Sequence, residues 1–166
     1  MNWVLVSKSN ALLQEYHLLH DNECKMVLKY NPHQNSARIN CGTHNRLFFI
    51  EEGNALNGKI IIINEYGMQL GSITGDKRNN QRGTVVIERK KFLYQFQQNL
   101  LPELFIHEGD NKKISRCGLK TINENTGARF PANNKGGFKN CLLLGLCWYL
   151  FLPLAKENVP VYAVAV

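Results

Sequence analysis

The segment Cys141–Ala155 holds fifteen consecutive residues without a charged or amide side chain. A helix that is apolar on every face has to be buried, either in a protein core or in a bilayer. We predict a helix over Phe138–Ala155 that kinks or ends close to Pro153, since proline disrupts a helix interior. Eighteen helical residues would span roughly 27 Å.

The chain before this segment has the period of β-strands. Cys24–Tyr30, Ala37–Cys41 and Phe92–Gln97 alternate apolar and polar residues, which is typical of strands with one buried and one wet face. Turns rich in Gly, Asn, Asp and Pro separate such stretches, and Gly75–Gly83 is one of them. Further strands are predicted at Trp3–Ser7, Gln14–His20, Arg46–Ile50, Lys59–Ile63, Met68–Ile73, Thr84–Glu88, Glu103–His107 and Ile114–Gly118.

These patterns predict one domain over residues 1–166. Around eleven strands fill about 1–120, a polar loop follows at 121–137, and the central helix at 138–155 precedes a tail at 156–166. The β-branched stretch Val159–Val166 in the tail is a candidate for one more strand. The apolar stretch at the N-terminus has four residues, too short for a signal peptide, so export is not expected.

Two environments suit the apolar helix. A membrane span needs about 20 apolar residues, and this run has fifteen between Lys139 and Lys156. A sheet of many strands tends to close, and a barrel of eleven or twelve strands leaves a cavity that something must fill. We therefore favour a closed barrel around the helix, and the membrane span stays as the alternative.

A family resemblance supports the barrel. The relevant residues are Asn64–Gly67, Gly71, Ile73, Asn125, Gly127, Phe130–Pro131 and the whole segment Glu124–Glu157. In their order and spacing the chain resembles the tubby-like superfamily, which includes the tubby C-terminal domain, the plant LURP-one-related proteins and the phospholipid scramblases. It implies a mainly β fold, a closed antiparallel β-barrel of about twelve strands around a central C-terminal hydrophobic α-helix, with Val159–Val166 beyond that core.

The positive charge of the chain lies in its middle. Residues 77–139 contain thirteen Lys and Arg against five Asp and Glu, whereas residues 1–76 sum to −1 and residues 140–166 to zero. Such an excess favours a polyanionic partner, although a solvated basic surface explains it equally well. The resemblance implies phosphoinositide headgroups as ligands, but it assigns no residue to them.

Candidate lipid- or anion-binding residues are therefore chosen by charge. If the strands form a meander, the turns at 89–91 and 109–113 lie at one barrel end and the loop at 75–83 at the other. Glu108 and Asp110 dilute the positive charge at the first end. The candidates are Lys77, Arg78, Arg82, Arg89, Lys90, Lys91, Lys112 and Lys113.

No metal or cofactor is expected. The resemblance to scramblases raises calcium binding in the loop before the helix, but here that loop has one carboxylate, Glu124, beside Arg129 and Lys135. Calcium takes six to eight oxygen ligands, several of them from carboxylates. His33, Cys41 and His44 supply three potential ligands near one hairpin, whereas structural zinc usually takes four.

Neither catalysis nor export has a signature in the sequence. It contains no GxSxG, P-loop, HExxH or GxGxxG motif, so we expect a protein that is not an enzyme. Five cysteines without a CxxC pair favour reduced, buried thiols in an intracellular setting.

Taken together, these features predict a cytoplasmic barrel that is peripheral at the membrane and binds anionic lipid or another polyanion. Nucleic acid is the less favoured partner, and a monomer is assumed. The alternatives are a membrane-anchored protein that uses the C-terminal helix as a span, and a protein-interaction module with no lipid role.

Overall fold

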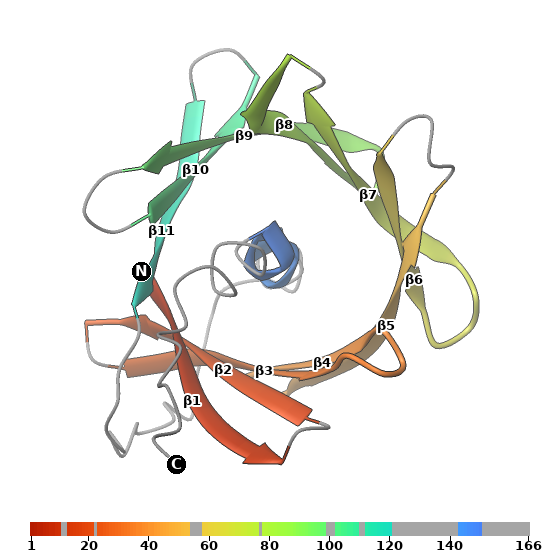
Figure 1. Ribbon diagram of the computed structural model, residues 1–166, viewed down its shortest axis with the longest axis vertical. Helices are drawn as coiled ribbons and strands as arrows, with labels where there is room; N and C mark the ends of the chain where they lie inside the picture. The colour runs from red at the N-terminus through yellow and green to blue at the C-terminus, as the bar shows by residue number, and fades with distance from the viewer. Residues whose placement is uncertain are drawn as a thin grey trace, which may run out of the picture.

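The computed structural model describes residues 1–10, 13–21, 23–53, 58–76, 78–98, 102–109, 112–120 and 143–150. Eleven strands in these ranges close into one barrel in which each strand lies beside its neighbours in sequence (Figure 1). The strands are β1 (Asn2–Asn10), β2 (Leu13–His20), β3 (Glu23–Asn31), β4 (Ser36–Cys41), β5 (His44–Glu52), β6 (Lys59–Asn64), β7 (Gln69–Asp76), β8 (Asn79–Ile87), β9 (Lys90–Gln98), β10 (Pro102–Glu108) and β11 (Lys112–Lys120). The predicted closed barrel is confirmed, and each strand predicted from residues 1–120 overlaps an observed one.

The two-residue period decides which side chains enter the barrel. On β4, Ala37 and Ile39 are buried, whereas the alternate residues Arg38 and Asn40 are exposed. The same alternation puts apolar residues of every neighbouring strand on one concave face, where they share a continuous core. The hydrophobic pattern therefore excludes a one-residue slip in register, because such a slip would expose this whole set.

The barrel closes through a parallel pair, which corrects the prediction of a wholly antiparallel barrel. In an up-and-down meander consecutive strands alternate in direction, so an odd number of strands makes the first and the last parallel. β1 and β11 pair in parallel at Asn2↔Gly118, Trp3↔Leu119 and Val4↔Lys120. The described strands number one fewer than the predicted count of about twelve, and the tail Val159–Val166 lies outside the described residues.

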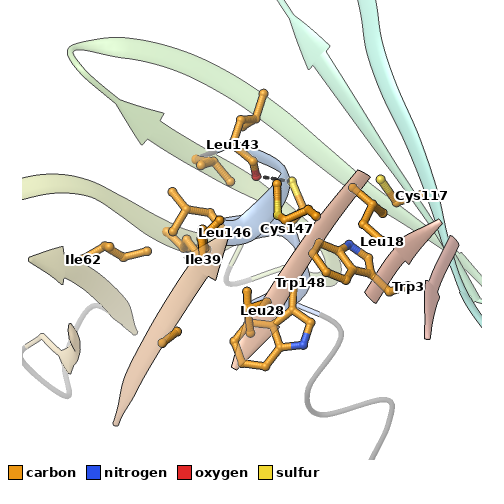
Figure 2. Packing of buried hydrophobic residues seen from close by; sticks show 14 of the residues in the cluster. Trp3, Leu18, Leu28, Ile39, Ile62, Cys117, Leu143, Leu146, Cys147 and Trp148 are labelled. Atoms are coloured by element: carbon orange, nitrogen blue, oxygen red, sulfur yellow. Dashed lines mark hydrogen bonds between the residues drawn. The ribbon is translucent and has the colours of Figure 1, made fainter. Parts of the chain in front are cut away.

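A helix at 143–150 lies inside the ring of strands (Figure 1). Leu143, Leu146, Cys147 and Trp148 are buried and belong to the same hydrophobic cluster as the strands (Figure 2). These eight residues fall within the helix predicted over Phe138–Ala155, and the remainder of that segment lies outside the described residues. No helix in the described part of the chain is both long and apolar enough to cross a bilayer.

Aromatic contacts join the helix to the barrel wall. The Trp148 ring makes edge contacts with Tyr16 and Tyr30, at centroid distances of 5.0 and 5.1 Å. The Tyr16 hydroxyl donates to Gln14 Oε1 at 2.8 Å, and burial raises the pKa of Tyr16 to about 12. Edge-to-face pairs of this kind contribute about 0.5–1.5 kcal/mol each beyond the burial of their area.

The helix approaches β4 closely at Gly145. A Cβ atom at this position would overlap the end of the Ile39 side chain, which would have to move to make room for it. One residue further on, Leu146 is fully buried against the wall. The single glycine of the apolar segment therefore lies where the helix comes close to β4.

The cysteines differ from prediction at one position. Cys24, Cys117 and Cys147 are free and buried, as expected for small apolar thiols. Cys41 is disulfide-bonded, so the prediction of reduced thiols is wrong there. The prediction failed because the spacing of cysteines in a sequence does not reveal which thiols lie close together in the fold. Disulfides persist mainly in oxidising compartments.

Candidate functional site

The β8–β9 turn presents three of the predicted cations. Arg89 lies in the two-residue turn between Ile87 and Lys90, and Lys90 and Lys91 begin β9. All three side chains are exposed. In a meander the β6–β7, β8–β9 and β10–β11 turns share one end of the barrel, here called the basic end.

The backbone of the β8–β9 turn is unusual for its sequence. Glu88 and Arg89 have φ angles of 47° and 66°, and a two-residue hairpin with both φ values positive strongly prefers Asn-Gly or Gly-Gly. An L-residue with a side chain loses about 1–2 kcal/mol in this region. The chain therefore accepts strain to keep two charged residues at the tip.

The strand register brings the β10–β11 turn close to these cations. Phe92 pairs with Glu108 and Glu108 pairs with Lys112, so the starts of β9 and β11 flank the end of β10. Lys90 Nζ lies 3.9 Å from Glu108 Oε1, an exposed ion pair that contributes little. In the described part of the chain, no carboxylate lies within ion-pair distance of Arg89 or Lys91.

The remaining predicted cations lie elsewhere. The backbone of Lys112 and Lys113 opens β11 at the basic end. Arg78 is exposed in the β7–β8 turn at the opposite end, and Lys77 lies outside the described residues. Arg82 belongs to β8, so the predicted loop Gly75–Gly83 is wrong: β7 continues to Asp76 and β8 begins at Asn79.

Glycines inside a sheet explain this error. Gly75 and Gly83 suggest a turn in the sequence, but they pair directly across β7 and β8. A Cβ atom on Gly83 would overlap the ring of Tyr94, which pairs with it from β9. Gly83 thus provides space for a neighbouring aromatic ring rather than for a bend.

Arg82 lines a groove along β7–β10. The groove has a volume of about 500 Å³. Asp76, one of its lining residues, accepts a hydrogen bond from the backbone N–H of Arg78 at 2.9 Å. Its polar lining includes Thr74, Asp76, Arg82, Thr84, Gln95 and His107. This part of the wall combines donors, acceptors and both charge signs, so it has no clear preference for an anion.

An exposed apolar pair accompanies the cations at the basic end. Tyr66 and Met68, in the β6–β7 turn, are 77% and 59% exposed. Asn64 Oδ1 accepts hydrogen bonds from the backbone N–H groups of both residues, at 3.0 and 2.8 Å, which organises the turn. The Glu88 N–H donates to the Leu70 carbonyl at 3.3 Å, so this turn and the cationic turn are neighbours.

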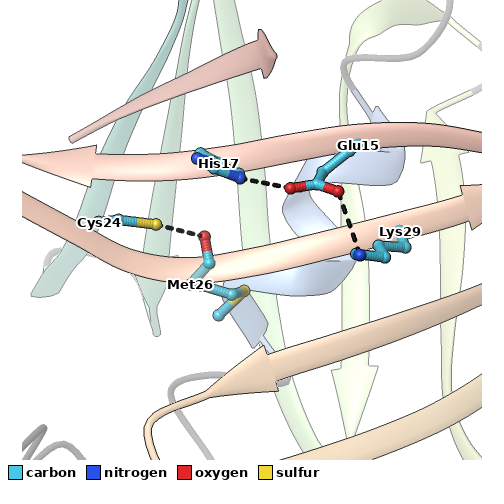
Figure 3. Close-up of polar contacts among 5 residues, drawn as sticks. All are labelled: Glu15, His17, Cys24, Met26 and Lys29. Atoms are coloured by element: carbon cyan, nitrogen blue, oxygen red, sulfur yellow. Dashed lines mark hydrogen bonds and ion pairs between the residues drawn. The ribbon is translucent and has the colours of Figure 1, made fainter. Parts of the chain in front are cut away.

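One polar cluster was missed by the sequence analysis. Glu15 Oε1 lies 2.8 Å from His17 Nε2, and Glu15 Oε2 lies 3.2 Å from Lys29 Nζ (Figure 3). Burial alone would raise the pKa of the Glu15 carboxyl, but the hydrogen bonds from His17 and Lys29 outweigh it and lower that pKa. The i, i+2 spacing of Glu15 and His17 on one strand is a signal, but the approach of Lys29 depends on hairpin register.

The described residues contain no group of three or more His, Cys, Asp and Glu side chains arranged to hold a metal ion. The loop at 121–137, where the resemblance to scramblases raised calcium binding, lies outside them. His17 is buried on β2, and His44 is exposed at the start of β5.

Comparisons of the chain with protein-family models, curated proteins and solved structures give no match. The tubby-like resemblance therefore stays a prediction.

Proposed function

We propose that this barrel is a non-enzymatic module that binds anionic phospholipid through its basic end, with a phosphoinositide-like headgroup as ligand. The strained β8–β9 turn carries the proposal. It holds Arg89 at an exposed tip beside Lys90 and Lys91, where Asn-Gly would cost less. Strain at a specific site is a common mark of function. The backbone of Lys112 and Lys113 begins β11, two strands away at the same end.

The apolar pair favours a membrane over a soluble polyanion. Tyr66 and Met68 project next to the cationic turn, and tyrosine is enriched at membrane–water interfaces. Cations that attract anionic headgroups and apolar side chains that enter the interface together make a peripheral membrane contact. Nucleic acid gives no reason to expose Met68, so it stays the less favoured partner.

The same proposal includes the finer architecture. A tubby-like barrel of about twelve strands around a helix over Phe138–Ala155 agrees with the helical residues 143–150 inside the ring. The predicted cytoplasmic location gains no support from the disulfide at Cys41. Burial of Leu146 and Trp148 against the wall argues against the alternative in which this segment crosses a bilayer. A protein-interaction module without a lipid role is the other alternative, and vesicle binding separates the two.

Co-sedimentation with vesicles tests the proposal. We expect the protein to pellet with phosphatidylcholine vesicles that contain a phosphoinositide and to stay in solution with phosphatidylcholine alone. Each basic residue near an anionic surface contributes about 1 kcal/mol, so Arg89→Glu/Lys90→Glu/Lys91→Glu should lower affinity by roughly a hundredfold or more. Tyr66→Ser/Met68→Ser should weaken binding without removing its dependence on anionic lipid.

A matched control is available at the other end of the barrel. Lys59 begins β6, away from the basic end, so Lys59→Glu should pellet like the wild type whereas Lys91→Glu should not. Circular dichroism establishes that each variant is folded. Equal pelleting with neutral and anionic vesicles, or an unchanged triple variant, would remove the proposal.

A further inference from the structure

A second cationic pair lies on the outer wall of the barrel, far from the basic end in sequence. Lys29 on β3 and Arg38 on β4 are direct cross-strand partners, and both are exposed. Like charges in directly opposite positions destabilise a sheet. Asn40 lies two residues after Arg38, on the same outer face of β4, and it pairs with Asn45 on β5.

The nearby carboxylate compensates only one of the two cations. Glu15 uses one oxygen for His17 Nε2, at 2.8 Å, and the other for Lys29 Nζ, at 3.2 Å (Figure 3). Within the described ranges, no carboxylate lies within ion-pair distance of Arg38. The guanidinium of Arg38 therefore retains a full positive charge and its N–H donors beside a lysine.

A groove of about 500 Å³ joins these groups. Its lining consists of Glu15, Val27, Lys29, Arg38, Asn40 and Asn45. Val27 points to the outer face, as Lys29 does, yet it is only 6% exposed. The groove therefore has an apolar, largely covered residue between charged and amide side chains from four consecutive strands, β2 to β5.

We propose that this groove binds the phosphate group of a small phosphorylated molecule. A phosphate monoester carries up to two negative charges and three acceptor oxygens, which suits an ammonium, a planar guanidinium and two amide donors. Arg38 can hold two phosphate oxygens at once, and Lys29 adds a point charge. A bound phosphate also relieves the repulsion between Lys29 and Arg38.

Glu15 limits the affinity of this site. Its negative charge opposes that of the phosphate, although His17 and Lys29 engage both of its oxygens. Replacing it by glutamine removes that charge and releases Lys29 toward the ligand. The site lies on β2–β5, across the ring from β8 and β9, so it is independent of the proposed membrane contact (Figure 1).

Titration of the ¹⁵N-labelled protein with inorganic phosphate at constant ionic strength tests the proposal. The Arg38 Nε–Hε resonance, assigned by its loss in Arg38→Lys, and the backbone amides of Asn40 and Asn45 should shift together. A single Kd of about 1 mM or tighter is expected for one good anion contact. Chloride at the same ionic strength should leave these resonances in place.

Variants make the result specific. Arg38→Ala should weaken phosphate binding at least tenfold, and Glu15→Gln should strengthen it severalfold. Arg116→Ala, an exposed arginine on β11 outside the groove, should have no effect and serves as the matched control. Tighter binding of acetate than of phosphate would assign a carboxylate ligand and overturn the proposal. Resonances that do not respond to phosphate, or an Arg38→Ala variant that binds like the wild type, would do so as well.

Discussion

Charged residues with positive φ angles at Glu88 and Arg89 connect stability and binding in a single turn. Each residue would reach a lower free energy if it were glycine or asparagine, because the left-handed region brings a Cβ atom too close to the backbone. Lys90 and Lys91 follow directly, so replacing the turn removes charge from the surface that we propose to contact lipid. Local stability and lipid affinity should therefore change in opposite directions.

The double variant Glu88→Asn/Arg89→Gly tests this opposition. Relief of two strained positions, reduced by the higher chain entropy of glycine in the unfolded state, should raise the free energy of unfolding by about 1 kcal/mol. Affinity for anionic vesicles should fall with the loss of Arg89. Urea denaturation and co-sedimentation measure the two effects. Arg89→Lys keeps both the positive charge and the strained backbone, so it should change neither the free energy of unfolding nor the vesicle affinity by much. A double variant that is less stable than the wild type would contradict the expected relief of strain.

Secondary-structure elements differ in how far their own sequence determines them. Alternation predicted β3, β4 and β9, and on β4 buried and exposed residues alternate from Ala37 to Cys41. It failed at the β7–β8 connection, because Gly75 and Gly83 serve packing against Tyr94 rather than a turn. Alternation also gave no sign that the closing strand pair is parallel. The direction of that pair depends on whether the number of strands is odd or even, which no single strand reveals.

Predictability of the sites follows the same rule. Arg89, Lys90 and Lys91 are adjacent in sequence, so charge alone identified them. The approach of Lys29 to Glu15 and the pairing of Lys29 with Arg38 depend on the register of two hairpins. Such register cannot be derived from local sequence, and for that reason the wall groove emerged only with the structure.

The helix inside the barrel gives a matched pair of substitutions. Leu146 is fully buried against the wall, whereas Leu144, two residues away, is only partly buried. A lysine at 146 would put an unpaired charge in the core, which costs several kcal/mol and approaches the total stability of a domain. Leu146→Lys should therefore fail to fold as a soluble protein, and Leu144→Lys should fold with a smaller loss.

Yield of folded protein and near-UV circular dichroism compare the two variants. Equal behaviour would mean that the packing at 143–150 does not control folding. A folded Leu146→Lys protein that differs from the wild type only in losing membrane association would support the alternative in which the helix enters a bilayer.

At the scale of the whole molecule, closure of the barrel depends on a short seam. β1 and β11 share three register pairs, whereas β1 and β2 pair from Asn2 to Asn10. The Gly118 N–H also donates to the Met1 carbonyl at 2.9 Å, and Trp3, at the centre of the seam, is fully buried. Few hydrogen bonds and one large side chain therefore hold the two edges together.

Native-state hydrogen exchange should show that the barrel opens first at this seam. Backbone amides of residues 2–4 and 118–120 that face across it depend on few hydrogen bonds, so they can open locally without unfolding the sheet. Their exchange should require at least about 2 kcal/mol less free energy than that of amides between β3 and β4, which share five register pairs. Trp3→Ala should lower the opening free energy of the seam more than that of β3–β4, because it removes the side chain buried there. Seam amides as protected as those of β3–β4 would instead mean that the ring opens only by global unfolding, and that the parallel pair is as strong as the antiparallel ones.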